Sequence, residues 1–143
     1  MLLSLLPSLL YITGTFALVL GILHFFFPIL FDFRGAIPEQ GSPLKPFPLM
    51  LTRYQTVRQD IYGLIWVMNH IASFALVTVG LLDLFWTVWL RSTYGALIAA
   101  WIALFYFLRA GTQLYMGRRR GDWIILAAFG ALGVFHLLVI FIS

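Results

Sequence analysis

The sequence RQDIYGLIWVMNHIASFALVTVG, residues 58–80, decides how the rest of this chain is interpreted. It begins with charged and amide side chains and continues as an apolar run, which is long enough to cross a hydrocarbon core of ~30 Å at ~1.5 Å per helical residue. Asn69 and His70 lie inside that run. Because an unpaired amide or imidazole is costly in hydrocarbon, we expect other helices to supply partners for this pair.

Three further apolar blocks have the same character. The chain of 143 residues is 62% hydrophobic, has a mean hydropathy of +0.99 and is only 10% charged, whereas soluble domains are about 25% charged. The sequence therefore predicts an all-α integral membrane four-helix bundle, formed by residues 1–143 as a single membrane domain. Its helices are expected at about 5–27, 60–82, 93–116 and 122–142, with a Pro-rich cytoplasmic connection at 28–59.

Basic residues fall mainly on one side of the predicted bundle. The connection at 28–59 contains four Lys or Arg residues and the connection at 117–121 contains three, whereas the opposite side contains Arg91. By the positive-inside rule, both basic connections face the cytoplasm and both termini lie on the extracytoplasmic side. Contact with membrane lipids at helix ends explains the net charge of +4, so we do not expect nucleic-acid binding.

Each of the other predicted helices also carries a polar side chain in its apolar run. These are His24, His136, and Arg109 with Gln113. An arginine in a membrane helix is normally functional or paired. If Asp60 reaches Arg109, the two form a structural ion pair; if it does not, Arg109 either snorkels to the interface or lines a cationic pocket.

Such a pocket would open to the cytoplasmic leaflet and would suit a lipid phosphate, a carboxylate or a quinone carbonyl. A polar and aromatic stripe on the second helix would form one wall of it, and polar residues of the first and third helices would complete it. The predicted ligand-binding residues are His24, Tyr62, Trp66, Asn69, His70, Tyr106, Arg109 and Gln113.

The histidines also allow a haem site. His70 and His136 lie about 15 Å and about 21 Å from the cytoplasmic end by helical rise, a mismatch that helix tilt can absorb, so both are candidate ligands of haem b. The alternative is that the histidines are neutral core residues, hydrogen-bonded across helices. We expect no cofactor, with haem b or a quinone as the alternative.

No catalytic constellation stands out in the sequence. Cysteine is absent, and no nucleophile with a base, paired carboxylates or known catalytic fingerprint is present, which favours a non-enzymatic protein. All five acidic residues lie at predicted helix ends or in loops, and Asp83 is placed where it can pair with Arg91 across an outer turn. This interpretation leaves no carboxylate inside the membrane, which argues against a proton-coupled transporter.

One segment resembles a known family. The run GILHFFFPILF, residues 21–31, followed by Ile37 and Pro38, is similar to the end of the first helix in DoxX-like small four-helix membrane proteins. There, a Gly-x-x-His-Phe-x-x-Pro-x-x-Phe pattern leads into a Pro-containing loop. The second helix departs from that pattern: where a small residue and a glutamate would be expected, this chain has Tyr62, Gly63, Trp66 and the pair Asn69 and His70.

The resemblance covers only the first helix and the following loop. It implies four helices in the bacterial cytoplasmic (inner) membrane, where some members of that group are linked to redox assemblies. A stripe containing Gly14, Ala17 and Gly21 on the first helix predicts close helix contact, within the bundle or with a homo-oligomer or membrane-complex partner.

The sequence thus predicts a small, non-enzymatic, multi-pass membrane protein whose intramembrane polar pocket binds a lipid-like or quinone-like ligand or docks a membrane partner. A haem b or quinone-linked membrane redox protein is the first alternative. A proton-coupled transporter or channel subunit is the second, since His and Arg at staggered depths can relay protons.

Overall fold

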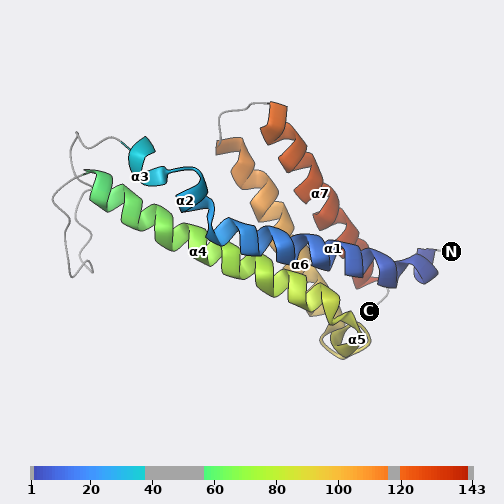
Figure 1. The fold of residues 1–143 in the computed structure, drawn as a ribbon. Coiled ribbons are helices and arrows are strands. Elements are labelled where there is room, and N and C mark those ends of the chain that lie inside the picture. Colours follow the sequence, from blue (N-terminus) through green and yellow to red (C-terminus); the bar gives the residue numbers. More distant parts are fainter. Residues whose placement is uncertain (1, 38–56, 116–119, 142–143) are drawn as a thin grey trace, which may run out of the picture. The chain divides into compact units, whose positions relative to one another are not determined.

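The computed structural model describes residues 2–37, 57–115 and 120–141, and these ranges contain helices and turns but no strand. Four helices are long, three are single turns, and a 3-10 turn extends one of the long helices (Figure 1). The long helices are α1 (Leu2–Phe25), α4 (Val57–Leu84), α6 (Gly95–Thr112) and α7 (Arg120–Ile140). The short elements are α2 (Phe27–Leu30), α3 (Phe33–Ala36), α5 (Trp86–Trp89) and η1 (Gln113–Tyr115).

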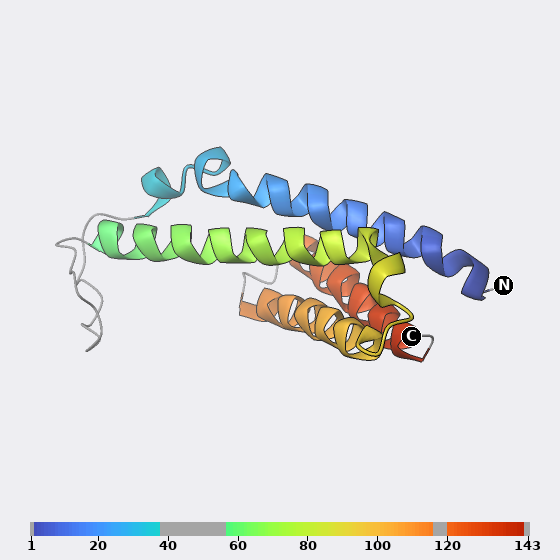
Figure 2. The ribbon, with the colours of Figure 1, turned by 90° about the horizontal axis from the view of Figure 1, so that it is seen from below.

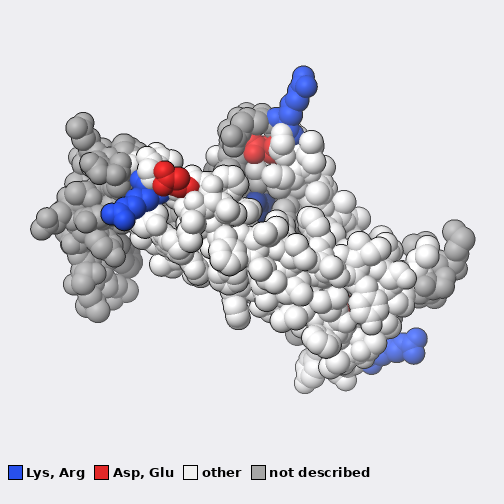
Figure 3. Space-filling view, in the orientation of Figure 1, with Lys and Arg blue, Asp and Glu red and all other residues white. Residues whose placement is uncertain are grey.

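Each long helix contains a segment that is long and apolar enough to cross a membrane. These segments are 5–25, 61–84, 95–115 and 120–140, and each ends within a helical turn of the predicted span. Only 22 to 33% of each segment is buried inside the protein, so apolar side chains cover most of its outer surface. Charged side chains are scarce along the helices on the face shown in Figure 3.

The chain is therefore an all-helical, multi-pass membrane protein, and its long helices are compatible with the predicted four-helix membrane bundle. The side of the membrane on which the termini lie stays a prediction. The Pro-rich connection predicted at 28–59 is described only at its ends, because residues 38–56 lie outside the described residues.

The chain divides into two compact units, and α1 and α4 each contribute to both. We call Gly14–Leu81 the α1–α4 unit. We call Met1–Thr13 together with Leu82–Ser143 the α6–α7 unit, which therefore also holds the first half of α1 and the last turn of α4. The two units are described separately below.

In the α1–α4 unit, glycines allow the two helix backbones to touch (Figures 1 and 2). A Cβ atom on Gly80 would lie 2.6 Å from the backbone nitrogen of Leu18 and 2.8 Å from the carbonyl oxygen of Gly14. A Cβ atom on Gly21 would lie 2.8 Å from the backbone nitrogen of Val77. These separations are too short for a side chain, so the close contact predicted from the small-residue stripe is confirmed.

In the α6–α7 unit, the two long helices pack against each other as an antiparallel hairpin (Figure 2). Small residues allow this approach: Ala99 and Ala103 of α6 are fully buried, and the ring of Phe107 covers Gly133 of α7. The core of the unit also contains large side chains with essentially no exposed surface, namely Leu10, Ile102, Tyr106, His136 and Val139.

We predict that Gly80→Ala destabilises the protein because the added methyl group meets the backbone of α1. The expected loss is about 1–3 kcal/mol, the usual range for overpacking. Gly130→Ala is the matched control, since a Cβ atom at Gly130 meets nothing within 4 Å and alanine is the better helix former. Thermal unfolding in detergent measures both variants; equal unfolding temperatures for the two would contradict direct backbone contact at Gly80.

Candidate functional site

A buried carboxylate, Asp83, lies in the last turn of α4. It has no exposed surface, and the apolar segment of α4 continues past it to Leu84. Two predictions are therefore wrong: Asp83 does not pair with Arg91, which is exposed, and the membrane segments do contain a carboxylate. The reason is that α4 extends beyond the predicted end at residue 82, which turns Asp83 toward polar partners inside the α6–α7 unit.

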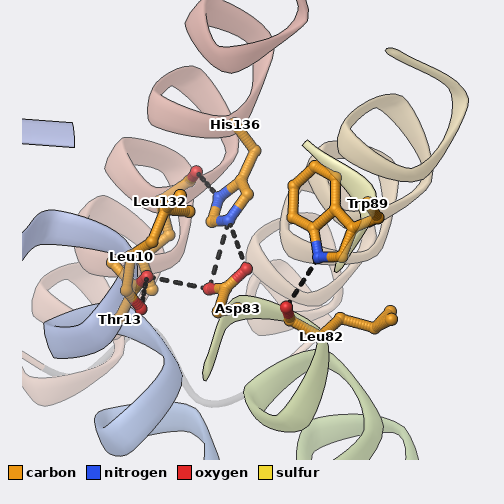
Figure 4. A network of polar contacts seen from close by, with 7 residues as sticks. All are labelled: Leu10, Thr13, Leu82, Asp83, Trp89, Leu132 and His136. Carbon is orange, nitrogen blue, oxygen red and sulfur yellow. Dashed lines mark hydrogen bonds and ion pairs between the residues drawn. The ribbon is translucent and has the colours of Figure 1, made fainter. Parts of the chain in front are cut away.

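These partners come from α7 and α1 (Figure 4). Nε2 of His136 lies 3.0 Å from Oδ1 and 3.2 Å from Oδ2 of Asp83, and the Thr13 hydroxyl lies 2.8 Å from Oδ2. His136 is fully buried and Thr13 is nearly so. Backbone carbonyls close both ends of the network, because Nδ1 of His136 donates to Leu132 O at 2.9 Å and Thr13 Oγ1 lies 3.1 Å from Leu10 O.

The number of protons that this network needs can be counted from its acceptors. A carbonyl oxygen only accepts, so Nδ1 of His136 carries a proton. Four contacts run in series between the two carbonyls, and each needs one proton to be a hydrogen bond. The Thr13 hydroxyl and Nδ1 supply two of these protons. Filling all four contacts with separate protons would place the other two on the Asp83 carboxyl and on Nε2 of His136; with an ionised carboxylate, the Thr13 hydroxyl donates to Asp83 Oδ2.

The hydrogen bonding of the Asp83–His136 pair depends on how many protons the pair holds besides the one on Nδ1. With one proton it is either an imidazolium facing a carboxylate or an imidazole facing a carboxylic acid, and one contact stays unfilled. With two protons all four contacts are hydrogen bonds and the pair is cationic. With none, the Nε2 lone pair faces a carboxylate, which is repulsive at 3.0 Å.

Tyr106 of α6 packs against this pair. Its ring centroid lies 5.2 Å from that of His136 and 6.0 Å from that of Phe129. The side chain is fully buried, and its hydroxyl has no hydrogen-bond partner in the described part of the chain. A buried polar group without a partner costs about 1–3 kcal/mol, which makes this hydroxyl unusual in a folded protein.

A second network of polar side chains lies at the opposite end of the α6–α7 hairpin. Nη1 of Arg109 donates to Oε1 of Gln113 at 2.9 Å, and Nε2 of Gln113 donates to Oδ1 of Asp122 at 2.8 Å. The amide thus bridges a guanidinium and a carboxylate. The Arg109 guanidinium also lies 5.1 Å from the centre of the Phe129 ring, which is the range of a cation–π contact.

The predicted residues of the α1–α4 unit form two groups. Nδ2 of Asn69 donates to the carbonyl oxygen of His24 at 2.7 Å, which confirms that Asn69 finds a partner on another helix. In the second group, the His70 ring stacks on Trp66 with centroids 4.9 Å apart, and Tyr62 meets Trp66 edge-on. Nδ1 of His70 donates to the Trp66 carbonyl within the same helix, at 2.8 Å.

The predicted ligand pocket combines residues of both units and stays a prediction. Within the α6–α7 unit, Arg109 and Gln113 are in contact as the spacing suggests, whereas the Tyr106 hydroxyl bonds to neither. The predicted ion pair between Asp60 and Arg109 cannot be described, because the Asp60 side chain lies outside the described side chains.

The haem hypothesis meets an obstacle at His136. Both ring nitrogens have hydrogen-bond partners, so iron coordination through Nε2 would displace Asp83 and leave a buried carboxylate without its partner. For His70, Nδ1 is the ring nitrogen that has a hydrogen-bond partner in the described part of the chain. Among the described residues, no three His, Asp or Glu side chains gather closely enough to hold a metal ion.

The sequence analysis did not assign three residues to the two polar networks: Thr13, Asp83 and Asp122. One signal was present, because His136 was predicted to lie in the outer half of the membrane and Asp83 at the outer end of the second helix. Apolar residues flank Asp83 on both sides, Leu82 and Leu84, which is unusual for a residue in a solvated turn.

Comparison with known proteins adds no identification. No family model matches the sequence, and neither a curated protein nor a solved structure matches it. The resemblance of residues 21–31 to DoxX-like proteins therefore stays a prediction from the motif.

We predict that His136→Leu destabilises the protein by about 3–5 kcal/mol, because it leaves the Asp83 carboxylate buried without its partner. The double variant Asp83→Val/His136→Leu removes both ionisable groups and should lose less stability than the single variant. The free energy of unfolding in detergent, measured with increasing denaturant, compares them. Additive losses in the double variant would show that Asp83 and His136 do not stabilise each other.

Proposed function

We propose that this protein binds and releases protons inside the membrane and carries them across it, as a proton channel or as a subunit of a proton-coupled transporter in the bacterial cytoplasmic (inner) membrane. The observation that supports this proposal is the fully buried Asp83–His136 pair, with Nε2 and Oδ1 3.0 Å apart in a membrane segment. Ionisable residues at such positions commonly mark proton pathways.

A purely structural role for the pair is the main alternative. Asp83 and His136, with Thr13, do connect α1, α4 and α7. However, a buried ion pair contributes little net stability, because desolvation offsets most of the attraction between the charges. Neutral amide or hydroxyl side chains would connect the same helices without that penalty. The presence of two titratable groups therefore favours a role in proton binding.

Proton transport therefore takes precedence over the ligand-binding pocket that the sequence favoured. Proton-coupled transport ranked low there because no carboxylate was expected inside the membrane, and Asp83 removes that objection. Four helices are few for a transport path. The predicted homo-oligomer, or a membrane-complex partner, therefore remains part of this proposal.

We expect Asp83→Asn to abolish proton transport without unfolding the protein. Asparagine has nearly the same shape, can accept from Nε2 of His136 and can donate to Thr13, but it does not bind protons. Protein in liposomes containing a pH-sensitive dye, with a potassium diffusion potential as the driving force, should acidify the lumen. The rate in the variant should fall on the order of tenfold or more.

Asp32→Asn is the matched control for this measurement, since Asp32 is exposed at the start of α3. It should transport protons at the wild-type rate. Infrared difference spectra between acid and alkaline pH provide a second readout: wild type and Asp32→Asn should share a component of the protonated-carboxyl band that is missing from Asp83→Asn. Wild-type flux equal to that of protein-free liposomes, or equal flux in wild type and Asp83→Asn, would overturn the proposal.

A second candidate function is the binding of a lipid-like or quinone-like ligand at Arg109. Within the described residues, this half-buried guanidinium makes hydrogen bonds only through Nη1, to Gln113 and Thr112. Nε and Nη2 are left as donors for a phosphate, a carboxylate or a quinone carbonyl. This observation supports the ligand hypothesis drawn from the sequence.

Arg109→Ala should therefore lose a copurifying lipid or quinone that the wild-type protein retains. Native mass spectrometry of the detergent-purified protein detects the bound molecule, and size-exclusion chromatography checks that the variant stays monodisperse. Arg91→Ala, an exposed arginine between α5 and α6, should retain the ligand. Equal retention in both variants would remove Arg109 from the binding site.

A further inference from the structure

The Tyr106 hydroxyl is a feature of the α6–α7 unit that packing alone does not explain. It is fully buried and has no hydrogen-bond partner in the described part of the chain. Its ring lies 5.2 Å from that of His136, whose Nε2 lies 3.0 Å from Oδ1 of Asp83. A polar group that is buried and unpaired therefore lies beside the proton-binding pair.

Phenylalanine would fill the same space without this penalty. The ring of Tyr106 already makes its aromatic contacts with His136 and Phe129, and none of them needs the hydroxyl. The chain contains 14 Phe and 6 Tyr residues, so a plain ring is its common choice for a core position. An oxygen that costs about 1–3 kcal/mol in the described arrangement is expected to find its partners in another one.

We propose that the Tyr106 hydroxyl is the third proton-transfer group of this site and connects the Asp83–His136 pair to water. This inference rests on the proposed function. In the transfer, Nε2–H of His136 gives its proton to the Tyr106 oxygen while the Tyr106 O–H proton passes to a water molecule. One N–H bond breaks, one O–H bond of Tyr106 is exchanged for another, and the positive charge moves from the imidazolium to the water.

The groups around Tyr106 limit the direction of this transfer. Asp83 of α4 and His136 of α7 are the titratable groups on one side, with Thr13 of α1 hydrogen-bonded to Asp83. The Phe129 ring contacts both Tyr106 and the Arg109 guanidinium, which is a cation and does not accept a proton. The proton that leaves Tyr106 is therefore assigned to water and not to Arg109.

Tyr106→Phe tests the inference because it removes one oxygen atom and keeps the ring. Proton flux into liposomes should fall on the order of tenfold or more, and the dependence of flux on pH should change. The unfolding temperature should stay the same or rise, since a buried unpaired hydroxyl has been removed. Tyr94→Phe, at an exposed position before α6, is the matched control and should behave as wild type.

The outcomes separate this inference from the proposed function. If Asp83→Asn abolishes flux and Tyr106→Phe leaves its rate and pH dependence unchanged, the proton site stands and the role of Tyr106 is overturned. A lower flux in Tyr106→Phe together with a lower unfolding temperature indicates a packing role and also overturns it. If Asp83→Asn retains wild-type flux, the proposed function fails, and the inference fails with it.

Discussion

The need to pair the Asp83 carboxylate with the His136 imidazole is the constraint around which the other polar groups of this end of the α6–α7 unit are arranged. In a membrane segment no bulk water solvates either group, so each needs the other as a hydrogen-bond partner that offsets the cost of its burial. Thr13 extends the contact to a third helix. Packing of small residues brings α6 and α7 together, and this polar network links the first half of α1 and the end of α4 to α7.

Two polar networks lie at the α6–α7 hairpin, and in each a nitrogen base and a carboxylate are connected by hydrogen bonds. In one, His136 faces Asp83; in the other, Gln113 bridges Arg109 to Asp122. Each network can therefore be electrically neutral by itself, which limits the free-energy cost of burying its ionisable groups. The Phe129 ring contacts both Arg109 and Tyr106, so an apolar group lies next to both networks. Exchange of protons between them would require water.

The sequence predicted those parts of the site that depend on helical spacing. Arg109 and Gln113 are four residues apart and lie in contact, and Asn69 finds a partner on α1 as its burial requires. The role of Asp83 was predicted incorrectly because an acid near the end of an apolar run is normally interfacial, and local composition does not reveal what faces it. Thr13 gave no signal at all, since a threonine in a membrane helix can bond to its own backbone.

The sequence by itself determined the helical class, the number and length of the membrane segments and the contacts between residues one turn apart. These follow from hydrophobic length and from the backbone repeat, which are local properties. Only the tertiary structure decided that Asp83 meets His136, 53 residues away, and Thr13, 70 residues away. Such partners depend on how separate helices pack, because small residues allow close approach and buried polar groups must be paired across the contact.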